Sequence, residues 1–378
     1  MKPLYFDYNA TTPVLPRVAR AITPWLTDHF GNPGSDHLWG LTARQGVDEA
    51  RVAVAALVNC LPEEIIFTSC ATESNNLALF GSLTPGDHVI TSAVEHPAVL
   101  EPLKIYEKEH GEVTILPVDT HGLVSPDDAA RAVTAQTKLV TIMLANNETG
   151  VIQPVQQIAA AVRARKPDLL VHTDAAQAVG KIQVDVNELG VDLLTIAGHK
   201  LYAPKGIGAL VVRRGVRLVP RLFGGGQEGG IRPGTENVPY MAGLAEACRL
   251  AHDDLEEEFI RQQRLGAVLA RSIEECGGKF RIHGSGAPRL PNTMSVGFQN
   301  LRAGDIISGL VGLDVGVSAG AACHGLHVGT MSHVLEAMNT DPAYGLGTIR
   351  ISWGRPTSEN DVRELADRLK QVLKPLHP

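Results

Sequence analysis

Short apolar runs alternate with longer segments of helical periodicity through the first 212 residues of the chain. Strands separated by helix-length segments are typical of a mostly parallel sheet with crossover helices. Ligands of such sheets collect at the carboxyl ends of the strands, so chemistry is expected in the loops that follow them. The predicted strands are residues 64–68, 88–91, 113–116, 139–144, 169–173, 193–196 and 208–212.

The pattern changes after Phe223, where a glycine-rich stretch extends to Gly234. A long helix is predicted over residues 238–275, and a final helix is predicted from its N-cap Ser358 to a stop at Pro375. A few strands are predicted between these helices, at residues 281–298, 315–318 and 348–352. Together these elements indicate a second, smaller α+β domain.

The composition is that of an ordinary globular protein, because 44% of the 378 residues are hydrophobic and 20% are charged. A chain of this size can bury a large core and form two domains. The formal net charge of -7 and the pI near 6.1 provide no basic surface. Nucleic acid and an anionic membrane are therefore not expected as partners, and a small metabolite is the better candidate.

The first seven residues lack the apolar core of a signal peptide, and no apolar run reaches the roughly 18 residues of a membrane span. We therefore expect a cytoplasmic protein. The five cysteines are odd in number and form no CxxC pair, which argues against a disulfide framework or a structural zinc site. A reactive thiol is compatible with this pattern.

Two predicted strands end in reactive polar groups. The strand at 169–173 leads to Asp174, and the strand at 193–196 leads to Lys200. A lysine that bonds to the aldehyde of pyridoxal phosphate, and a carboxylate that keeps its ring nitrogen protonated, are what an enzyme with this cofactor needs. The alternative is that Lys200 is a solvated loop residue and Asp174 a helix cap.

A predicted anion site follows the first large-domain strand, where residues 69–76 open a helix. Backbone N–H groups at a helix N-terminus, around Ala71, together with the Thr72 hydroxyl would hold a cofactor phosphate. Simple helix capping is the alternative, and both roles can hold at once.

Two further strand ends carry His96 and Asn147. A flat imidazole suits stacking on a pyridine ring, and an asparagine amide can donate to its phenolic oxygen. We assign these roles to His96 and Asn147 from their place in the series, since a single histidine is otherwise more often structural.

The motifs of the chain resemble those of the NifS-type cysteine desulfurases over nearly its whole length. They are Asp7-Tyr8-Asn9-Ala10-Thr11-Thr12-Pro13, Phe30-Gly31-Asn32-Pro33, Ala71-Thr72-Glu73-Ser74-Asn75-Asn76, Glu95-His96, Asn146-Asn147-Glu148, Asp174-Ala175-Ala176-Gln177, Gly198-His199-Lys200, Arg232-Pro233-Gly234-Thr235 and Ala321-Ala322-Cys323. Within that family, the stretches 144–149, 223–228, 232–237 and 320–324 are most similar to the selenocysteine lyase branch.

The resemblance implies a pyridoxal phosphate-dependent homodimer of fold type I. Its α/β large domain, with a mostly parallel sheet flanked by helices, would span residues 15–260. The smaller α+β domain, built from residues 1–14 and 261–378, would carry the catalytic cysteine loop.

The resemblance also implies the cofactor contacts. Lys200 would bond to the cofactor, Asp174 would pair with its pyridinium and His96 would stack on the ring. Gln177 and Asn147 would contact the phenolic oxygen.

The phosphate contacts implied by the resemblance come from two chains. Thr72 and His199 of one subunit, together with Ala71 at the helix N-terminus, would bind the phosphate. Thr235 would reach the same phosphate from the other subunit, so each active site would need both chains.

Substrate chemistry is implied at three further positions. Cys323 matches the family nucleophile, in a segment whose small residues and glycines suit a flexible loop. Arg350 matches the arginine that holds the substrate α-carboxylate, assisted by Asn32. An interdomain salt bridge is the alternative role of Arg350. Cys60, Cys248 and Cys276 lie in helical patterns and are expected to be buried.

Two positions depart from the family pattern. Ala197 stands where most desulfurases have a serine before Gly-His-Lys, so one phosphate hydroxyl is missing. Cys70 replaces the usual glycine of the phosphate loop and places a second thiol near the cofactor. A metal site at Cys323, His324, His327 and His333 is a further alternative, but we expect no metal.

The expected reaction removes sulfur or selenium from L-cysteine or L-selenocysteine and leaves L-alanine. The chalcogen would pass to Cys323 as a persulfide or selenopersulfide, or leave as free chalcogenide, and an acceptor protein could take it on. The alternatives are another fold-type I aminotransferase or β-lyase, in which Cys323 has no role, and a sulfur-relay scaffold that holds the cofactor without turnover.

Overall fold

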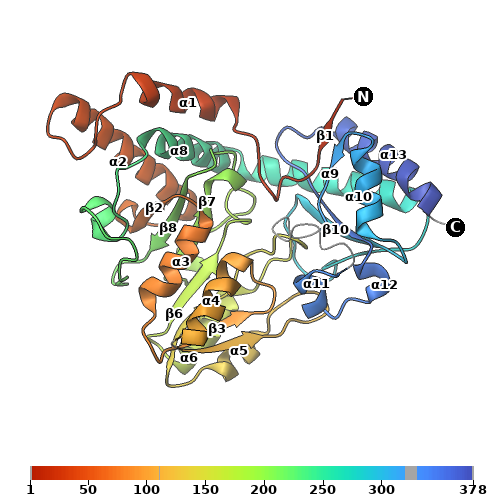
Figure 1. Ribbon diagram of the computed structural model, residues 1–378, viewed down its shortest axis with the longest axis horizontal. Helices are drawn as coiled ribbons and strands as arrows, with labels where there is room; N and C mark the ends of the chain where they lie inside the picture. The colour runs from red at the N-terminus through yellow and green to blue at the C-terminus, as the bar shows by residue number, and fades with distance from the viewer. Residues whose placement is uncertain (1, 110, 320–329, 377–378) are drawn as a thin grey trace.

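The computed structural model describes residues 2–109, 111–319 and 330–376. Its main feature is a sheet with the strand order β2-β8-β7-β6-β5-β3-β4 (Figure 1). Every pairing in this sheet is parallel except those of β8, which runs antiparallel to both of its neighbours. The strands are β2 (Ile65–Thr68), β3 (His88–Ser92), β4 (Glu112–Leu116), β5 (Thr137–Thr141), β6 (Leu170–Asp174), β7 (Leu193–Ala197) and β8 (Gly208–Val212).

Helices cover both faces of this sheet, and nearly every residue of its inner strands is therefore buried. Adjacent residues of one strand enter different hydrophobic clusters, as with Leu193 and Leu194 of β7. One cluster includes side chains of α2, α6 and α8, and the other those of α3 and α4. The helices are α1 (Pro16–Thr27), α2 (Leu38–Val58), α3 (Ala71–Ser82), α4 (Pro97–Glu109), α5 (Pro126–Ala132), α6 (Val155–Arg165), α7 (Val186–Leu189) and α8 (Val238–Asp253).

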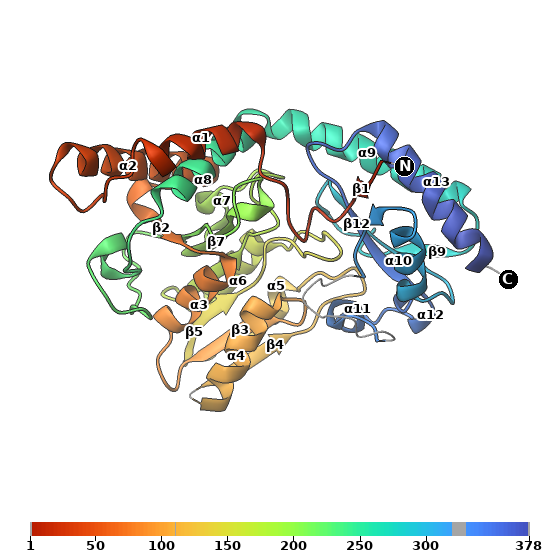
Figure 2. The ribbon, with the colours of Figure 1, turned by 45° about the horizontal axis from the view of Figure 1, so that its top comes forward.

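A smaller sheet of order β12-β10-β9, antiparallel throughout, lies beside the first unit (Figure 2). The N-terminal β1 pairs in parallel with β11. Side chains of these strands and of α9, α10 and α13 form a separate hydrophobic cluster that also contains Leu4 and Phe6. The elements are β1 (Leu4–Tyr5), α9 (Leu255–Glu275), β9 (Phe280–Ile282), β10 (Thr293–Phe298), α10 (Ala303–Val311), β11 (Val315–Gly316), α11 (His333–Ala337), α12 (Pro342–Gly345), β12 (Thr348–Ser352) and α13 (Glu359–Leu376).

Two expectations about helices need correction. The single helix expected over 238–275 is broken at Asp254, whose ψ of 8° is not helical and whose carboxylate accepts a hydrogen bond from Arg355 at 2.8 Å. Pro375 does not stop the last helix before it, because α13 includes this residue and extends to Leu376. Ser358 does cap α13, since its hydroxyl accepts from Asp361 N at 3.1 Å.

The proposed division into residues 15–260 and residues 1–14 with 261–378 stays a prediction. Some residues after position 260 do not pack into the hydrophobic cluster of the smaller sheet. Leu290, Val334 and Met338 pack into the core of the large sheet. Across residues 2–109, 111–319 and 330–376, no helix combines the length and the apolar character that a membrane span requires.

Candidate active site

The carboxyl ends of β6 and β7 form the centre of the candidate site. The two strands are parallel neighbours, and Asp174, the last residue of β6, pairs in register with Thr195 of β7. Lys200 ends the short 3-10 turn η2 (Gly198–Lys200) that follows β7 directly. The prediction that Asp174 and Lys200 come from neighbouring strand ends is therefore confirmed.

The Asp174 carboxylate is buried and meets only donors among its recorded contacts. One oxygen accepts from the backbone N–H of Ala176 at 2.9 Å, and the other accepts from the amide of Asn75 at 2.7 Å. These are the contacts that an ionised carboxylate needs. His172, two residues earlier, hydrogen-bonds through its ring to Thr141 and Thr195, and burial lowers its pKa to about 4.

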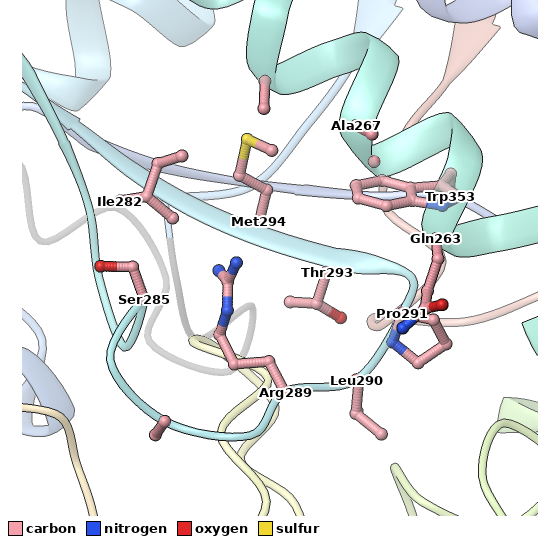
Figure 3. A pocket seen from close by; sticks show the side chains of 13 residues that line it. Gln263, Ala267, Ile282, Ser285, Arg289, Leu290, Pro291, Thr293, Met294 and Trp353 are labelled. Carbon is pink, nitrogen blue, oxygen red and sulfur yellow. The ribbon is translucent and has the colours of Figure 1, made fainter. Parts of the chain in front are cut away.

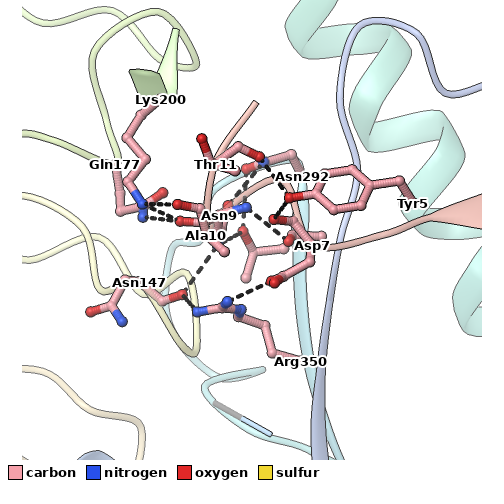
Figure 4. Close-up of polar contacts among 12 residues, drawn as sticks. Tyr5, Asp7, Asn9, Ala10, Thr11, Asn147, Gln177, Lys200, Asn292 and Arg350 are labelled. Atoms are coloured by element: carbon pink, nitrogen blue, oxygen red, sulfur yellow. Dashed lines mark hydrogen bonds and ion pairs between the residues drawn. The ribbon is translucent and has the colours of Figure 1, made fainter. Parts of the chain in front are cut away.

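The amine of Lys200 is held by the N-terminal segment of the chain. Its Nζ donates to the carbonyl of Asn9 at 2.5 Å and to that of Ala10 at 2.8 Å, as Figure 4 shows. These carbonyls lie about 190 positions away in the sequence, so the lysine is oriented by a contact that only the folded chain provides.

Asn9 joins the two units of the molecule. Its carbonyl also accepts from the side chain of Gln177 at 3.0 Å. Its side-chain amide donates to the carbonyl of Asn147 at 3.2 Å and to the hydroxyl of Thr293 at 2.8 Å. Its side-chain oxygen accepts from Asn292 at 3.2 Å. Loops after β5, β6 and β7 and a strand of the smaller sheet thus meet at one buried asparagine (Figure 4).

Lys181 is a buried residue that the sequence reasoning missed. Its Nζ lies 2.7 Å from Oε1 of Gln177 and 3.3 Å from Oδ1 of Asn9. With Oε1 turned to this amine, Nε2 of Gln177 must face the Asn9 carbonyl, so both ends of the amide are specified. Burial, with the charges of Lys200 and Arg350, lowers the pKa of Lys181 well below its usual range. The sequence feature that could have indicated burial of Lys181 is its apolar neighbours, Val179 and Ile182.

His96 occupies the entry to α4, where its Nδ1 accepts from the backbone N–H of Ala98 at 3.0 Å. The preceding Glu95 is fully buried and accepts from the hydroxyl of Ser92 and the backbone N–H of Met143. Burial, with the nearby charge of Asp174, raises the pKa of Glu95 to about 8. Glu95, which was not assigned a role from sequence, thereby fixes the His96 loop to the loop that leads to Asn147.

The N-terminus of α3 has the properties of an anion site. Helix α3 begins at Ala71, its N-cap Cys70 makes no side-chain cap, and Thr72 is exposed in the first turn. Nearby, the ring Nδ1 of His199 lies 3.1 Å from the hydroxyl of Thr11. Burial, followed by the charges of Lys200, Lys205 and Lys181, lowers the pKa of His199 to about 4. The ring is therefore neutral near pH 7, with one N–H to donate.

Arg350 lies on β12 and is almost fully buried. One Nη donates to Asp7 at 2.6 Å in an ion pair, and the other donates to the Asn147 carbonyl at 3.0 Å. Its Nε has no partner among the described residues. The ion pair with Asp7 joins two residues of the predicted smaller domain, so it is not the interdomain salt bridge considered as the alternative. The contact with Asn147 places the guanidinium beside the loop of a predicted cofactor residue.

Two predicted site residues have no recorded contact with this centre. Asn32 is exposed in the loop between α1 and α2, where its side chain accepts from Gly34 N at 2.9 Å. Thr235 is exposed in the loop before α8. Their predicted roles stay predictions.

The cysteines divide into three groups. Cys323 lies outside the described residues, as do His324 and His327. Cys248 is fully buried within α8, and burial raises its pKa to about 12. The expectation of full burial is wrong for Cys60 and Cys276, which are half-buried just after helices α2 and α9. Cys70 is half-buried at the start of α3.

Comparison with known proteins gives consistent relationships. Residues 4–365 match the model of the aminotransferase class-V family. A cysteine desulfurase IscS from Dictyoglomus turgidum is 41% identical over 99% of this chain and 95% of its own length.

Solved structures show the same relationship. A NifS-like protein superposes with a TM-score of 0.92 at 36% identity, covering 99% of this chain and all of the other. SspA in complex with cysteine has a TM-score of 0.80 at 35% identity, covering 92% of this chain and 98% of the other. The predicted α/β fold of type I is thereby confirmed.

Proposed function

This chain belongs to the aminotransferase class-V family as one of its cysteine desulfurases, and on that basis we propose that it removes sulfur from L-cysteine with pyridoxal phosphate and releases L-alanine. The observation that supports this most is the meeting of Gln177 and Lys200 on the carbonyl of the buried Asn9, whose side chain contacts the Asn147 carbonyl that also binds Arg350.

The residues of the site fit pyridoxal phosphate. Asp174 offers a buried carboxylate for a ring nitrogen, and the α3 N-terminus with Thr72 and His199 offers donors for a phosphate. Nζ of Lys200 donates to the carbonyls of Asn9 and Ala10 at 2.5 and 2.8 Å, which orients the amine for a bond with an aldehyde. When bound, the cofactor supplies an electron-withdrawing ring that stabilises negative charge at the substrate α-carbon.

The side chains of the chain then have separate tasks. Arg350 binds the substrate carboxylate through its planar guanidinium, assisted by Asn32. Nζ of Lys200 takes the proton from the substrate α-carbon and later returns one to the product. His96 covers the ring face, and Gln177 and Asn147 donate toward the phenolic oxygen.

Sulfur transfer is assigned to Cys323. Its thiolate bonds to the substrate sulfur while the substrate carbon–sulfur bond breaks, leaving the bond electrons on the alanine side, where a proton is taken up. The product on the enzyme is a persulfide, which a thiol acceptor reduces. Selenocysteine is the second candidate substrate, on the grounds of the sequence resemblance, and Cys323 would then act mainly as a proton donor.

The test is release of alanine and chalcogenide by the purified holoenzyme, with L-cysteine and L-selenocysteine compared side by side. We expect turnover of L-cysteine that is lost in Cys323→Ala and kept in the matched variant Cys60→Ala. Loss in Cys70→Ala with retention in Cys323→Ala would move the nucleophile to Cys70. Alanine production that survives both changes would indicate another lyase, and none with either substrate would refute the proposal.

A homodimer is the proposed assembly, and apolar exposure supports it. Asn32 and Thr235 lie in or near loops that carry exposed large apolar side chains, including Phe30, Trp39 and Phe223, the last of which is 92% exposed. Such clusters mark interaction surfaces. A partner seated on them would bring Asn32 or Thr235 to the neighbouring site.

Mixed dimers test whether the site is shared. In a heterodimer of Lys200→Ala and Thr235→Val chains, a shared arrangement restores one complete site, whereas sites within single chains would both stay defective. We expect one tight cofactor site per heterodimer and activity near half that of the wild-type dimer. A heterodimer whose tightest site binds pyridoxal phosphate no better than the Thr235→Val homodimer does would refute the contribution of Thr235 from the partner.

A further inference from the structure

A cavity of about 400 Å³ lies in the smaller unit, between α9, the segment before β10 and Trp353 (Figure 3). Its volume is in the range of small-molecule sites. Its walls contain one cation and no acidic residue. The lining residues are Gln263, Gly266, Ala267, Ala270, Ile282, Ser285, Ala287, Arg289, Leu290, Pro291, Thr293, Met294 and Trp353.

Arg289 is the cation, and its guanidinium points into the cavity between Met294, Ser285 and Thr293 (Figure 3). No hydrogen bond or ion pair of this side chain is present in the described part of the chain, and its Nη1 is buried. Burial lowers the pKa of Arg289, and no acidic side chain opposes this effect.

Arg289 is half-buried overall, and a guanidinium with a buried nitrogen and no counter-charge is costly. The more deeply buried arginines Arg350 and Arg368 each have a carboxylate partner. The accessible surface of the cavity is more polar than apolar, because Leu290, Met294 and Trp353 are already buried in its walls, whereas Gln263 and Ser285 are exposed on its rim. An occupant must therefore supply negative charge to Arg289.

We propose that this cavity binds a small organic acid, with its carboxylate on the Arg289 guanidinium beside Ser285 and Thr293. The cavity is separate from the substrate site, because none of its lining residues is a cofactor or substrate residue. It does share a wall with the catalytic network. Thr293 accepts from Asn9, and Leu290 N donates to the Gly150 carbonyl at 2.8 Å, three residues after Asn147.

The test titrates the holoenzyme with phenylacetate and, separately, with the uncharged phenylacetamide, by calorimetry and by the fluorescence of Trp353 in a Trp25→Phe, Trp39→Phe background. Saturable binding of phenylacetate, about tenfold or more tighter than that of the amide, is expected because a charged hydrogen bond is lost with the amide. Equal binding of the two compounds, or no binding of phenylacetate, overturns the proposal without any variant of the cavity.

Variants locate the binding. Arg289→Leu removes the cation and Ala267→Phe fills the rim while keeping it, and each is expected to weaken phenylacetate binding at least about tenfold. The matched control is Arg271→Leu, which removes an exposed arginine from α9, the helix that carries Ala267. Binding must persist in Arg350→Lys, since its loss there would place the probe in the substrate site and refute the inference. Unchanged binding in Arg289→Leu would refute it as well.

Discussion

The inner and outer halves of the candidate site are built in different ways. The inner residues Asp174, Gln177 and Arg350 are almost fully buried, and each has two or more recorded polar contacts. The outer residues Thr72 and Thr235 are exposed. One chain thus completes the part that would handle electrons and protons, whereas the part that would hold phosphate stays open to solvent or to a partner.

This difference separates two kinds of mutational effect. Changes in the inner half have the larger effects, on chemistry, on fold stability or on cofactor affinity, because its groups are desolvated and mutually dependent. Changes in the outer half alter ligand affinity by the smaller amounts typical of exposed hydrogen bonds.

The largest effect is expected for Lys200→Ala, because the amine that moves the substrate proton is removed. Alanine release should fall by about a thousandfold or more, which corresponds to about 4 kcal/mol of transition-state stabilisation. The exposed neighbour Lys205→Ala is the control and should keep its activity. Retention of a tenth of the wild-type rate in Lys200→Ala would contradict the assignment.

Asp7→Ala should lower the free energy of unfolding by about 3 kcal/mol, since it leaves the buried Arg350 charge without its carboxylate. Denaturant unfolding measures this difference. The exposed pair of Arg131 and Asp128 provides the comparison, and Asp128→Ala should cost less than about 1 kcal/mol. Similar losses in the two variants would mean that the Asp7 pair is not desolvated.

His172 gives a pH test of the inner half. Its folded pKa of about 4 lies below the ordinary value of 6.5, so its contribution is complete above pH 6.5 and is lost as the pH falls toward 4. The free energy of unfolding of the wild type, measured relative to that of His172→Gln, should therefore fall by about 3 kcal/mol as the pH is lowered across this window.

Glu95→Gln is a control for that experiment, because its stability effect should depend on pH in the opposite direction. The folded pKa of Glu95, about 8, lies above the ordinary 4.5, so its favourable contribution is present at acid pH and is lost as the pH rises through this range. Urea midpoints at several pH values should show the two variants diverging from wild type in opposite directions. Parallel curves for His172→Gln and wild type would show that this ring is not held neutral.

Lys181→Met tests whether the buried amine orients Gln177. Loss of the donor lets the Gln177 amide turn, and cofactor affinity should drop by about tenfold, or about 1.4 kcal/mol, with little change in fold stability. Apoenzyme titrated with pyridoxal phosphate measures the affinity, with Lys166→Met as the control. Unchanged affinity and an unchanged cofactor absorption spectrum would leave Lys181 a packing residue.

The smallest effect is expected in the outer half, for Thr72→Val. One exposed hydroxyl donor to the phosphate is lost, which should weaken cofactor binding by about 1 kcal/mol while leaving the turnover of saturated enzyme unchanged. Thr23→Val, on an exposed face of α1, is the matched control. A larger loss than for Lys181→Met would reverse the comparison between the two halves.

Most of the large sheet could be predicted because its strands are buried on both faces and read as uninterrupted apolar runs. β8 was placed correctly at 208–212, but its antiparallel direction carries no local signal. The break at Asp254 was missed because the apolar spacing continues through it, and the contact with Arg355 comes from about 100 residues away.

The candidate site was predictable where a strand end fixes the position of a side chain, as for Asp174 and Lys200. It was not predictable where the partner is a backbone carbonyl or a distant loop. Neither the Asn9 contacts nor the Lys181 amine follows from local pattern, since both depend on segments more than 160 residues apart. The predicted role of Thr235 would depend on a second chain.

The N-terminal segment also bears on how the protein is made. The carbonyl of Phe6 accepts from Ser352 N at 2.8 Å, and Asn9 holds Lys200, so residues 4–10 must wait for the later synthesis of residues near position 350 before they dock. Such distant pairing forms slowly and late. We expect chains released before β12 to contain the large sheet but an unanchored Lys200, so that premature termination yields a folded remnant without catalysis.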